Sequence, residues 1–478
     1  MTTPTLARVF LGATLTGLAG GVLGAAPPAA PPAAASGQAA LVPVINAGER
    51  LLRFDWPALR IGTGEYEEGP TGLTVFQFAK RASAAVDVRG GSPGTVNTDY
   101  LRQGYPVPVL DAVVFAGGSA YGLEATTAVM SAMKDDGLRG GAWDNIAFAA
   151  GAIIYDLGDR RLNEVYPDKR LAQAAYRAAR PGLFPLGAQG AGRFAMNGRI
   201  FGCNVYSGEG GAFRQIGDLK IAAFTVVNAV GVVTARDGRV AACYRDPKWP
   251  ADLRTADLFA RFPATSRGEW PAVAAEPHGN TTISLVVTNR QLQPAQLQRL
   301  AALVHTSMAR AVQPFATEFD GDVLYAVSTG ELETPANPLE AFQIDVLASE
   351  VMWDAVLAAI PPQPAVTAPA GAAPAPRAEE LRRYAGDYGF GRGVCLRIAA
   401  DGPRLTAIAA GPLAVYAIGG GAPTALEPAG GTQFRVPGRY PLSLRFDGPS
   451  TVVVNPGHWQ QTGTRQKDCG SPAREAAR

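Results

Sequence analysis

The stretch Gly279-Asn-Thr-Thr-Ile-Ser-Leu-Val-Val-Thr-Asn289 joins a polar, proline-bearing segment to a run of β-branched and apolar residues. Such a run is typical of a buried strand, so Thr281 is expected to open a strand directly after an exposed segment. If the bond between Asn280 and Thr281 breaks, Thr281 gains a free α-amine beside its hydroxyl, and one residue then supplies both base and nucleophile. An ordinary turn before a strand can have the same sequence, so this interpretation needs support from elsewhere in the chain.

Five motifs provide that support because they follow one another in a fixed order. They are Asp87-Val-Arg-Gly-Gly-Ser-Pro-Gly-Thr-Val-Asn-Thr-Asp99, Phe115-Ala-Gly-Gly-Ser-Ala-Tyr-Gly-Leu123, Val226-Val-Asn-Ala-Val-Gly231, Asn280-Thr-Thr-Ile283 and Phe319-Asp-Gly-Asp322. Each motif is short, and the specificity lies in their number and order. Together they resemble the self-processing aminopeptidase family that includes the D-aminopeptidase/esterase DmpA, the β-peptidyl aminopeptidases and the 6-aminohexanoate-oligomer hydrolases. The resemblance runs from about Leu52 to about Ile360.

The resemblance implies an α/β fold, a four-layer αββα sandwich in which helices cover two stacked sheets, as in N-terminal-nucleophile hydrolases. It also implies an inactive precursor that is cut between residues 280 and 281 into two chains that stay associated. The hydrophobic pattern of residues 41–360 agrees, because it predicts alternating strands and helices. The predicted strands are 111–116, 147–155 and 221–227, and the predicted helices are 119–133, 293–312 and about 339–360.

In this family the residue after the cut is the nucleophile, and that role falls on Thr281. Asp320 and Asp322 lie two apart on an extended segment, which places them on one face; a surface turn is the alternative, and the resemblance implies that they orient and tune the nucleophile. Asn228 ends an apolar strand, and the family uses the matching Asn as an oxyanion donor. Arg199 stands where the family usually has a Lys, and a guanidinium stays protonated and cannot act as a base.

Two further sets of residues are candidates for substrate binding. Tyr155 lies near the position of a family Tyr that helps to bind substrate or oxyanion, and a core aromatic is the alternative. Gly117, Gly118 and Ser119 lead into the predicted helix 119–133, which Ser119 can cap, and backbone N–H groups there can bind an anion or a carbonyl oxygen. Tight packing between strand and helix explains the same glycines.

A serine–histidine–aspartate arrangement is hard to build from this sequence. His305 falls on the apolar side of a predicted helix, which is typical of a core histidine, and His278 and His458 lie far from it in the chain. Thr281 needs none of them, because an α-amine with a pKa of about 7.7–8.0 can act as its base. This chemistry needs no cofactor. The four cysteines form no Cys-x-x-Cys motif, so we also expect no metal site.

The composition limits the kinds of molecule that this protein is expected to bind. The chain has 478 residues, 47% of them hydrophobic and 18% charged, with 43 basic and 41 acidic residues. It can therefore bury a sizeable core, and its net charge of +2 gives no electrostatic reason to expect nucleic acid as a partner. We expect a small peptide or amide substrate and a homo-oligomer of the two processed chains.

Both ends of the chain carry additional segments. Residues 1–40 contain Arg8, an apolar run and Ala/Pro repeats, which is typical of a cleaved export signal. We therefore expect a periplasmic or secreted protein that does not stay in the membrane. Residues 361–377 have the composition of an extended linker, and short alternating strands in residues 378–478 predict a small antiparallel β-barrel that is separable from the hydrolase. The predicted barrel strands are 394–398, 404–408, 413–417, 433–435, 442–446 and 451–455.

The sequence thus predicts an exported serine/threonine-type amide hydrolase, an aminopeptidase that acts on short peptides or amides, including those with D- or β-residues. Two alternatives remain. One is an acyltransferase of the ornithine-acetyltransferase type, which would use the same threonine chemistry. The other is a non-catalytic exported binding protein, which Arg199 and the appended barrel make conceivable.

Overall fold

The computed structural model describes residues 41–102, 108–140, 142, 145–158, 160–203, 205–243, 252–261, 280–364, 377–391, 393–416, 418–436 and 442–469. The described residues, from 41 onward, belong to one compact unit. The predicted export signal, most of the predicted linker and the segment directly before Asn280 lie outside the described residues.

One long strand, β4 (Thr71–Val88), joins the two sheet layers of the hydrolase part. Its first half pairs with β3 (Leu59–Tyr66) and β6 (Val109–Ala116). Its last six residues pair with β17 (Val323–Leu332), which continues into the other layer. The strand order through both layers is β12-β13-β15-β17-β4-β6-β7-β5.

The remaining elements of this part alternate along the chain. The other strands are β1 (Val44–Ile45), β2 (Leu51–Arg53), β5 (Thr95–Val96), β7 (Ala149–Ile153), β8 (Arg180–Pro181), β9 (Leu183–Pro185), β10 (Met196–Asn197), β11 (Val205–Tyr206), β12 (Glu209–Ile216), β13 (Leu219–Asn228), β14 (Val232–Val233), β15 (Thr281–Arg290) and β16 (Val312–Gln313). The helices are α1 (Thr98–Arg102), α2 (Ser119–Gly122), α3 (Glu124–Asp135), α4 (Lys169–Arg177), α5 (Thr255–Arg261), α6 (Pro294–Ser307) and α7 (Pro338–Ala358), with short 3₁₀ turns at Gly190–Gly192, Arg199–Phe201 and Met308–Arg310.

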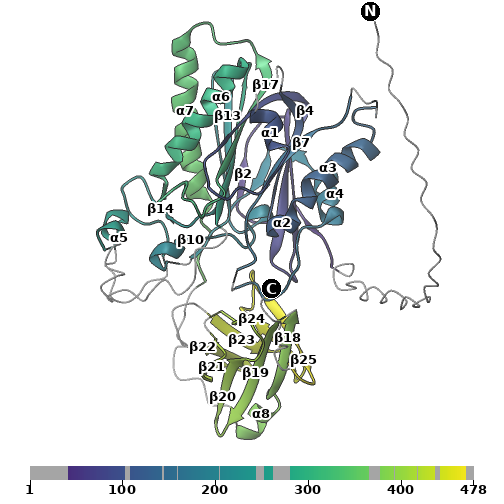
Figure 1. Cartoon of the computed structure of the whole chain (residues 1–478), viewed down its shortest axis with the longest axis vertical. Coiled ribbons are helices and arrows are strands. Elements are labelled where there is room, and N and C mark those ends of the chain that lie inside the picture. Colours follow the sequence, from purple (N-terminus) through teal and green to yellow (C-terminus); the bar gives the residue numbers. More distant parts are fainter. Residues whose placement is uncertain are drawn as a thin grey trace, which may run out of the picture. The chain divides into compact units, whose positions relative to one another are not determined.

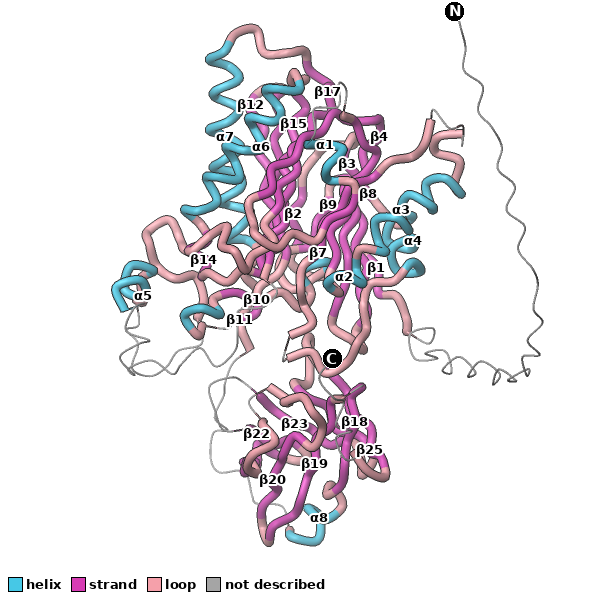
Figure 2. The backbone as a smooth tube through the Cα atoms, in the orientation of Figure 1, coloured by secondary structure: helices cyan, strands magenta, loops and turns pink. Residues whose placement is uncertain are grey.

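Three apolar clusters show that these elements form four layers. The cluster between the sheets contains Phe76, Phe115 and Phe224, one from each of three strands. A second cluster packs α6 and α7 on one outer face, and a third packs α3 and α4 on the other. Figures 1 and 2 show the strands between these two pairs of helices. The predicted αββα sandwich is therefore confirmed.

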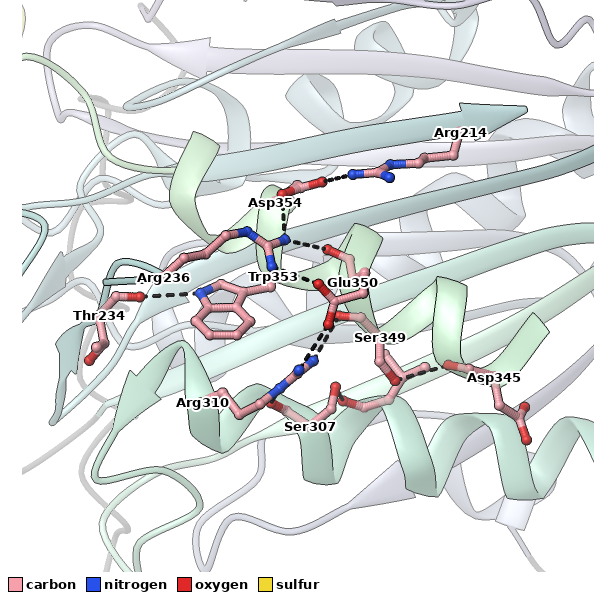
Figure 3. Close-up of polar contacts among 11 residues, drawn as sticks. Arg214, Thr234, Arg236, Ser307, Arg310, Asp345, Ser349, Glu350, Trp353 and Asp354 are labelled. Atoms are coloured by element: carbon pink, nitrogen blue, oxygen red, sulfur yellow. Dashed lines mark hydrogen bonds and ion pairs between the residues drawn. The ribbon is translucent and has the colours of Figure 1, made fainter. Parts of the chain in front are cut away.

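A polar network fastens α7 to its surroundings (Figure 3). Arg236 contacts Glu350 at 2.6 Å and Asp354 at 2.7 Å, and Arg310 contacts Glu350 at 2.8 Å. Both guanidinium carbons lie 4.7 Å from the centre of the Trp353 ring. Because the charged groups are partly exposed, each ion pair contributes little by itself, on the order of 1 kcal/mol or less.

The C-terminal part is a closed barrel of antiparallel strands, as the sequence predicted. It begins with a short helix, α8 (Ala378–Arg382). Its strands are β18 (Gly386–Gly391), β19 (Val394–Asp401), β20 (Arg404–Ala409), β21 (Thr424–Gly430), β22 (Gln433–Val436), β23 (Leu442–Phe446), β24 (Thr451–Val454) and β25 (Gln461–Gln466). Alternate residues of the strands point inward and fill the interior, among them Leu396, Phe434 and Phe446.

Some local predictions need correction. The expected helix at 119–133 is split into α2 and α3, and Ser119 does not cap it; Gly118 holds that position, and Ser119 has a left-handed φ of 54°. The expected strand at 413–417 is reduced to a bridge between Val415 and Ile418. Two disulfides form, Cys203–Cys243 and Cys395–Cys469, a pairing that the sequence left open.

Candidate active site

Thr281 is the first residue of β15, in the middle of a sheet layer. The strand pairs with β13 on one side and with β17 on the other, and Thr281 faces Asn228 across the β13 ladder. Only 3% of the Thr281 surface is exposed. The predicted strand start is therefore confirmed, and the backbone around the hydroxyl is fixed by neighbours on both sides.

Two hydrogen bonds meet on the carbonyl oxygen of Asn280, the carbonyl of the bond that was predicted to break. The Gly321 N–H donates to it at 2.9 Å. The Thr281 hydroxyl also donates to it, so the predicted nucleophile and this carbonyl lie side by side. A backbone N–H in this place stabilises the negative charge that develops when a carbonyl is attacked.

The space around Gly321 is too small for any side chain. A Cβ atom there would lie 2.6 Å from the Ser92 oxygen and 2.9 Å from the Thr281 hydroxyl oxygen. Gly90 packs equally closely on the other side, because its Cβ would lie 2.1 Å from the Asp322 nitrogen. The Gly-Gly pair of the motif that begins at Asp87 therefore lets two backbones approach at the site.

The two carboxylates brace the backbone around the nucleophile. Asp320 accepts hydrogen bonds from the Val230 N–H at 3.1 Å and from the Thr317 hydroxyl at 2.6 Å. Asp322 accepts one from the N–H of Thr282, the neighbour of Thr281, and another from the Ala316 N–H at 3.0 Å. These hydrogen bonds act on Thr281 through the main chain, and the predicted tuning of its amine stays a prediction.

Burial changes the protonation of this pair. Both side chains are about 1% exposed. Desolvation, followed by the negative charge of Asp320, raises the pKa of Asp322 to about 8. Burial also raises the pKa of Asp320. Near neutral pH the pair therefore keeps a proton that two exposed carboxylates would lose.

Asn228 connects two segments beside the bond between Asn280 and Thr281. Its amide oxygen accepts from the Met196 N–H at 3.0 Å, and its amide nitrogen donates to the Tyr155 carbonyl oxygen at 3.0 Å. The N–H that contacts the Asn280 oxygen belongs to Gly321. Asn228 therefore positions the Tyr155 and Met196 segments, and its role as an oxyanion donor stays a prediction.

A small cavity adjoins Asn280. Its volume is about 20 Å³, room for about one water molecule. We call its lining residues the pocket wall; they are Tyr155, Asp156, Gly158, Arg160, Phe194, Met196, Arg199, Asn228 and Asn280. The structure thus brings Arg199, Asn228 and Tyr155 together beside the predicted cut.

Gly117, Gly118 and Ser119 use their N–H groups within the chain. They donate to the Gly72 oxygen at 2.9 Å, to Asp156 at 2.7 Å and to the Ile154 oxygen at 3.1 Å, respectively. These three hydrogen bonds stabilise the left-handed turn of the chain and fix the start of α2. The segment thus serves strand-to-helix packing, and a contact with substrate stays a prediction.

The histidines do not join Thr281. His305 is fully buried on α6, where its Nδ1 atom lies 2.8 Å from Asp87, and burial lowers its pKa. His458 lies in the barrel and His278 outside the described residues. Within the ranges that the structure describes, no group of acidic, histidine or cysteine residues could hold a metal ion, and no helix is long and apolar enough to cross a membrane.

Comparison with known proteins decides the family. The family model described as peptidase family S58 matches residues 54–370. A 6-aminohexanoate-oligomer endohydrolase of Paenarthrobacter ureafaciens is 40% identical over 328 residues, 67% of this chain and 88% of that protein.

The chain belongs to peptidase family S58. It is a hydrolase that acts on amide or peptide bonds. An uncharacterized aminopeptidase of Mycobacterium tuberculosis is 33% identical over 276 residues, 55% of this chain and 75% of that protein. Among solved structures, a β-aminopeptidase of Burkholderia sp. is similar with a TM-score of 0.48 and 18% identity, covering 66% of this chain and 88% of that one.

Sequence patterns identified only part of the site of this S58 peptidase. Gly321 lies between the two predicted carboxylates, and its N–H is the group that contacts the Asn280 oxygen. Arg160 also lines the pocket, and no sequence motif singled it out. It lies in a loop, which hydrophobic periodicity does not describe.

Proposed function

We propose that this S58 hydrolase is made as a precursor that cuts itself between Asn280 and Thr281, and that Thr281 then hydrolyses short amides. The observation that carries the proposal is the pair of hydrogen bonds on the Asn280 oxygen, one from the Thr281 hydroxyl and one from the Gly321 N–H. Nucleophile, scissile carbonyl and oxyanion donor are thereby adjacent in the uncut chain.

Self-cleavage starts when the Thr281 hydroxyl oxygen bonds to the carbonyl carbon of Asn280. The hydroxyl proton passes to the nitrogen of Thr281, the C–N bond breaks, and an ester links Asn280 to the Thr281 oxygen. Water then hydrolyses the ester, which leaves a carboxyl group on Asn280 and a free hydroxyl and α-amine on Thr281. The Gly321 N–H binds the oxyanion in both steps.

In the mature enzyme the same oxygen attacks the amide of a substrate. The neutral α-amine of Thr281 takes the hydroxyl proton and returns it to the leaving amine, so that an acyl-enzyme forms. Water releases the acyl group in a second step. An α-amine suits this task because its ordinary pKa of about 7.7–8.0 leaves part of it neutral at physiological pH.

The substrate's acyl group takes the place that Asn280 holds before the cut. Asn280 forms part of the wall of this small cavity in the uncut chain. We expect the cavity to become larger when the new C-terminus leaves after the cut. The wall combines Tyr155, Phe194 and Met196 with charged groups, which suits an acyl chain with methylene groups and a polar end. We therefore propose short peptides and linear amide oligomers with a free amino end as substrates. Of these, the name of the Paenarthrobacter relative, a 6-aminohexanoate-oligomer endohydrolase, indicates the amide oligomers.

Interleaved strands support the proposal that the two fragments stay together. β13 pairs with β15 and β4 pairs with β17, and each pair has one strand from either side of the cut. The network of Figure 3 also crosses the cut, since Arg236 precedes it and Glu350 and Asp354 follow it. Each disulfide lies within one fragment, so the association would be non-covalent.

We also propose that the protein is exported. The Arg8 and apolar run of residues 1–40 are typical of a signal peptide. The two disulfides support export further, because such bonds persist in oxidising compartments.

The proposal is tested by comparing wild type with Thr281→Ala and with Thr282→Val as a neighbouring control. We expect wild type and Thr282→Val to give two fragments, the second beginning at Thr281, and Thr281→Ala to remain a single chain without amidase activity. Intact mass and N-terminal sequencing check this outcome. A wild-type chain that stays whole, or is cut at another bond, would show that Thr281 is not the nucleophile.

A further inference from the structure

The connection between β24 and β25 of the barrel is packed against the hydrolase part. The Trp459 ring stacks on Tyr206, with ring centres 3.9 Å apart and planes 8° from parallel, and its N–H donates to the Arg193 oxygen at 3.0 Å. Arg193 returns a hydrogen bond to the His458 oxygen at 2.8 Å. The His458 ring also contacts the Ala188 oxygen. These contacts join the barrel to the hydrolase part, and the separability of the barrel stays a prediction.

Gln461, two residues further on, holds a second segment. This side chain is fully buried, and its amide oxygen accepts from the Leu162 N–H at 2.6 Å. Its amide nitrogen donates to the Arg160 oxygen at 2.7 Å. Leu162 comes from the hydrolase part, yet its side chain packs in the apolar cluster of the barrel. Barrel residues thus fix both the main chain and a side chain of this loop.

The two segments that the barrel contacts are the ones that supply the pocket wall. The loop held by Gln461 provides Arg160 directly. The segment held by Trp459 runs from Arg193 into Phe194, and the Phe194 ring packs on Tyr206 with centres 5.8 Å apart. Trp459 and Gln461 therefore reach the back of the wall without entering the cavity.

We propose that the barrel sets the substrate pocket of this enzyme, with Trp459 and Gln461 as positioning residues that hold the Arg160 and Phe194 segments at the distance that fits the acyl group. This proposal rests on the proposed amide hydrolysis. Self-cleavage depends on Asn280, Thr281 and Gly321 and involves no bound substrate, so the barrel residues govern substrate binding and leave the self-cleavage rate unchanged.

Two variants test the proposal in the full-length, processed protein. Gln461→Leu keeps the size of the side chain and removes both hydrogen bonds, and Trp459→Leu removes the stacking on Tyr206. With the linear trimer of 6-aminohexanoate as probe, we expect KM to rise about fivefold or more in each variant while kcat stays within about twofold. Trp459→Phe keeps a ring against Tyr206 and is expected to restore most of the affinity. Arg435→Ala, which removes an exposed ion pair with Glu427 on the barrel surface, is the matched control.

Hydrogen exchange gives a readout that does not need activity. Peptides that cover residues 155–162 and 190–197 should exchange about fivefold faster in Gln461→Leu and Trp459→Leu than in wild type or Arg435→Ala. Wild-type KM and wild-type exchange in both variants would overturn the proposal, as would a loss of self-cleavage equal to the loss of hydrolysis. If wild type fails to hydrolyse the trimer, the proposed function fails on this substrate, and the exchange measurement still decides whether the barrel holds the wall.

Discussion

The two sides of the Asn280 carbonyl are built in different ways. On one side, strand pairing and backbone hydrogen bonds fix Thr281, Gly321 and the two carboxylates. On the other side, much of the pocket wall comes from loops and short elements that side chains hold, among them Gln461 and Trp459 of the barrel. Backbone contacts suit the bond-breaking groups, which tolerate little displacement, whereas a wall held by side chains can change with substrate. In the proposed mechanism, the chemistry and the substrate specificity therefore have separate structural supports.

The largest effect is expected from a substitution on the side of the carbonyl that backbone contacts hold, at the residue with the least free space around it. Gly321→Ala places a methyl group 2.6 Å from the Ser92 oxygen, so the N–H must move away from the Asn280 carbonyl. We expect self-cleavage to slow by about 10²-fold or more, the loss typical of a missing oxyanion donor. Gly419→Ala is the control, because no atom lies within 4 Å of its new methyl group. The appearance of fragments on denaturing gels measures both rates, and equal rates would contradict the assigned role.

A smaller change acts on the carboxylate that braces Thr282. In Asp322→Asn, an NH₂ group replaces one of the two oxygens that accept hydrogen bonds from the N–H groups of Thr282 and Ala316. One of these N–H groups then faces a donor instead of an acceptor. We expect self-cleavage and hydrolysis both to fall by about 10²-fold, as for a positioned acid–base group. Asp447→Asn on the barrel surface is the control. Full activity in Asp322→Asn would leave the carboxylate without a role in the chemistry.

The same carboxylate predicts a pH dependence of stability, best measured in the uncut Thr281→Ala protein. Burial raises the pKa of Asp322 to about 8, so the folded chain keeps a proton that the unfolded chain loses near its ordinary pKa of about 4. The folded state then binds more protons between these values, and the free energy of unfolding falls as pH rises from about 4 to about 8. Adding Asp322→Asn should flatten this slope in urea unfolding at three pH values spread across that window. An unchanged slope would show that a group other than Asp322 keeps this proton in the folded state.

The smallest effect is expected from a change remote from both sides of the carbonyl. Arg236→Ala removes partly exposed ion pairs with Glu350 and Asp354, and it should destabilise the protein by about 1 kcal/mol or less. Because β15 and β17 of the second fragment lie between β13 and β4 of the first in one sheet, we expect the processed fragments to coelute in gel filtration even at about 1 M salt, where exposed charges are strongly screened. Separation of the fragments in this variant would mean that the ion pairs, and not the sheet, hold them together.

Much of the fold and part of the site could be predicted from the sequence. The pattern of apolar residues predicted α6 and α7 within a few residues, and it predicted β13 and most barrel strands. The motif order predicted the family and the place of Thr281 at a strand start. Local rules failed at Ser119, where Asp156 and the Ile154 oxygen bind consecutive N–H groups and hold the chain in a left-handed turn.

The sequence by itself determined the family, because the five motifs follow one another in the family's order. Its apolar periodicity indicated which segments become buried strands and helices. It also determined the candidate nucleophile, because a threonine whose preceding peptide bond is cleaved has an α-amine that can act as its base. Only the tertiary structure decided which N–H faces the Asn280 carbonyl and that Trp459 and Gln461 lie behind the pocket wall. These contacts join residues separated by 41 to 301 positions, and no local pattern records such distances because they arise from the packing of whole layers and domains.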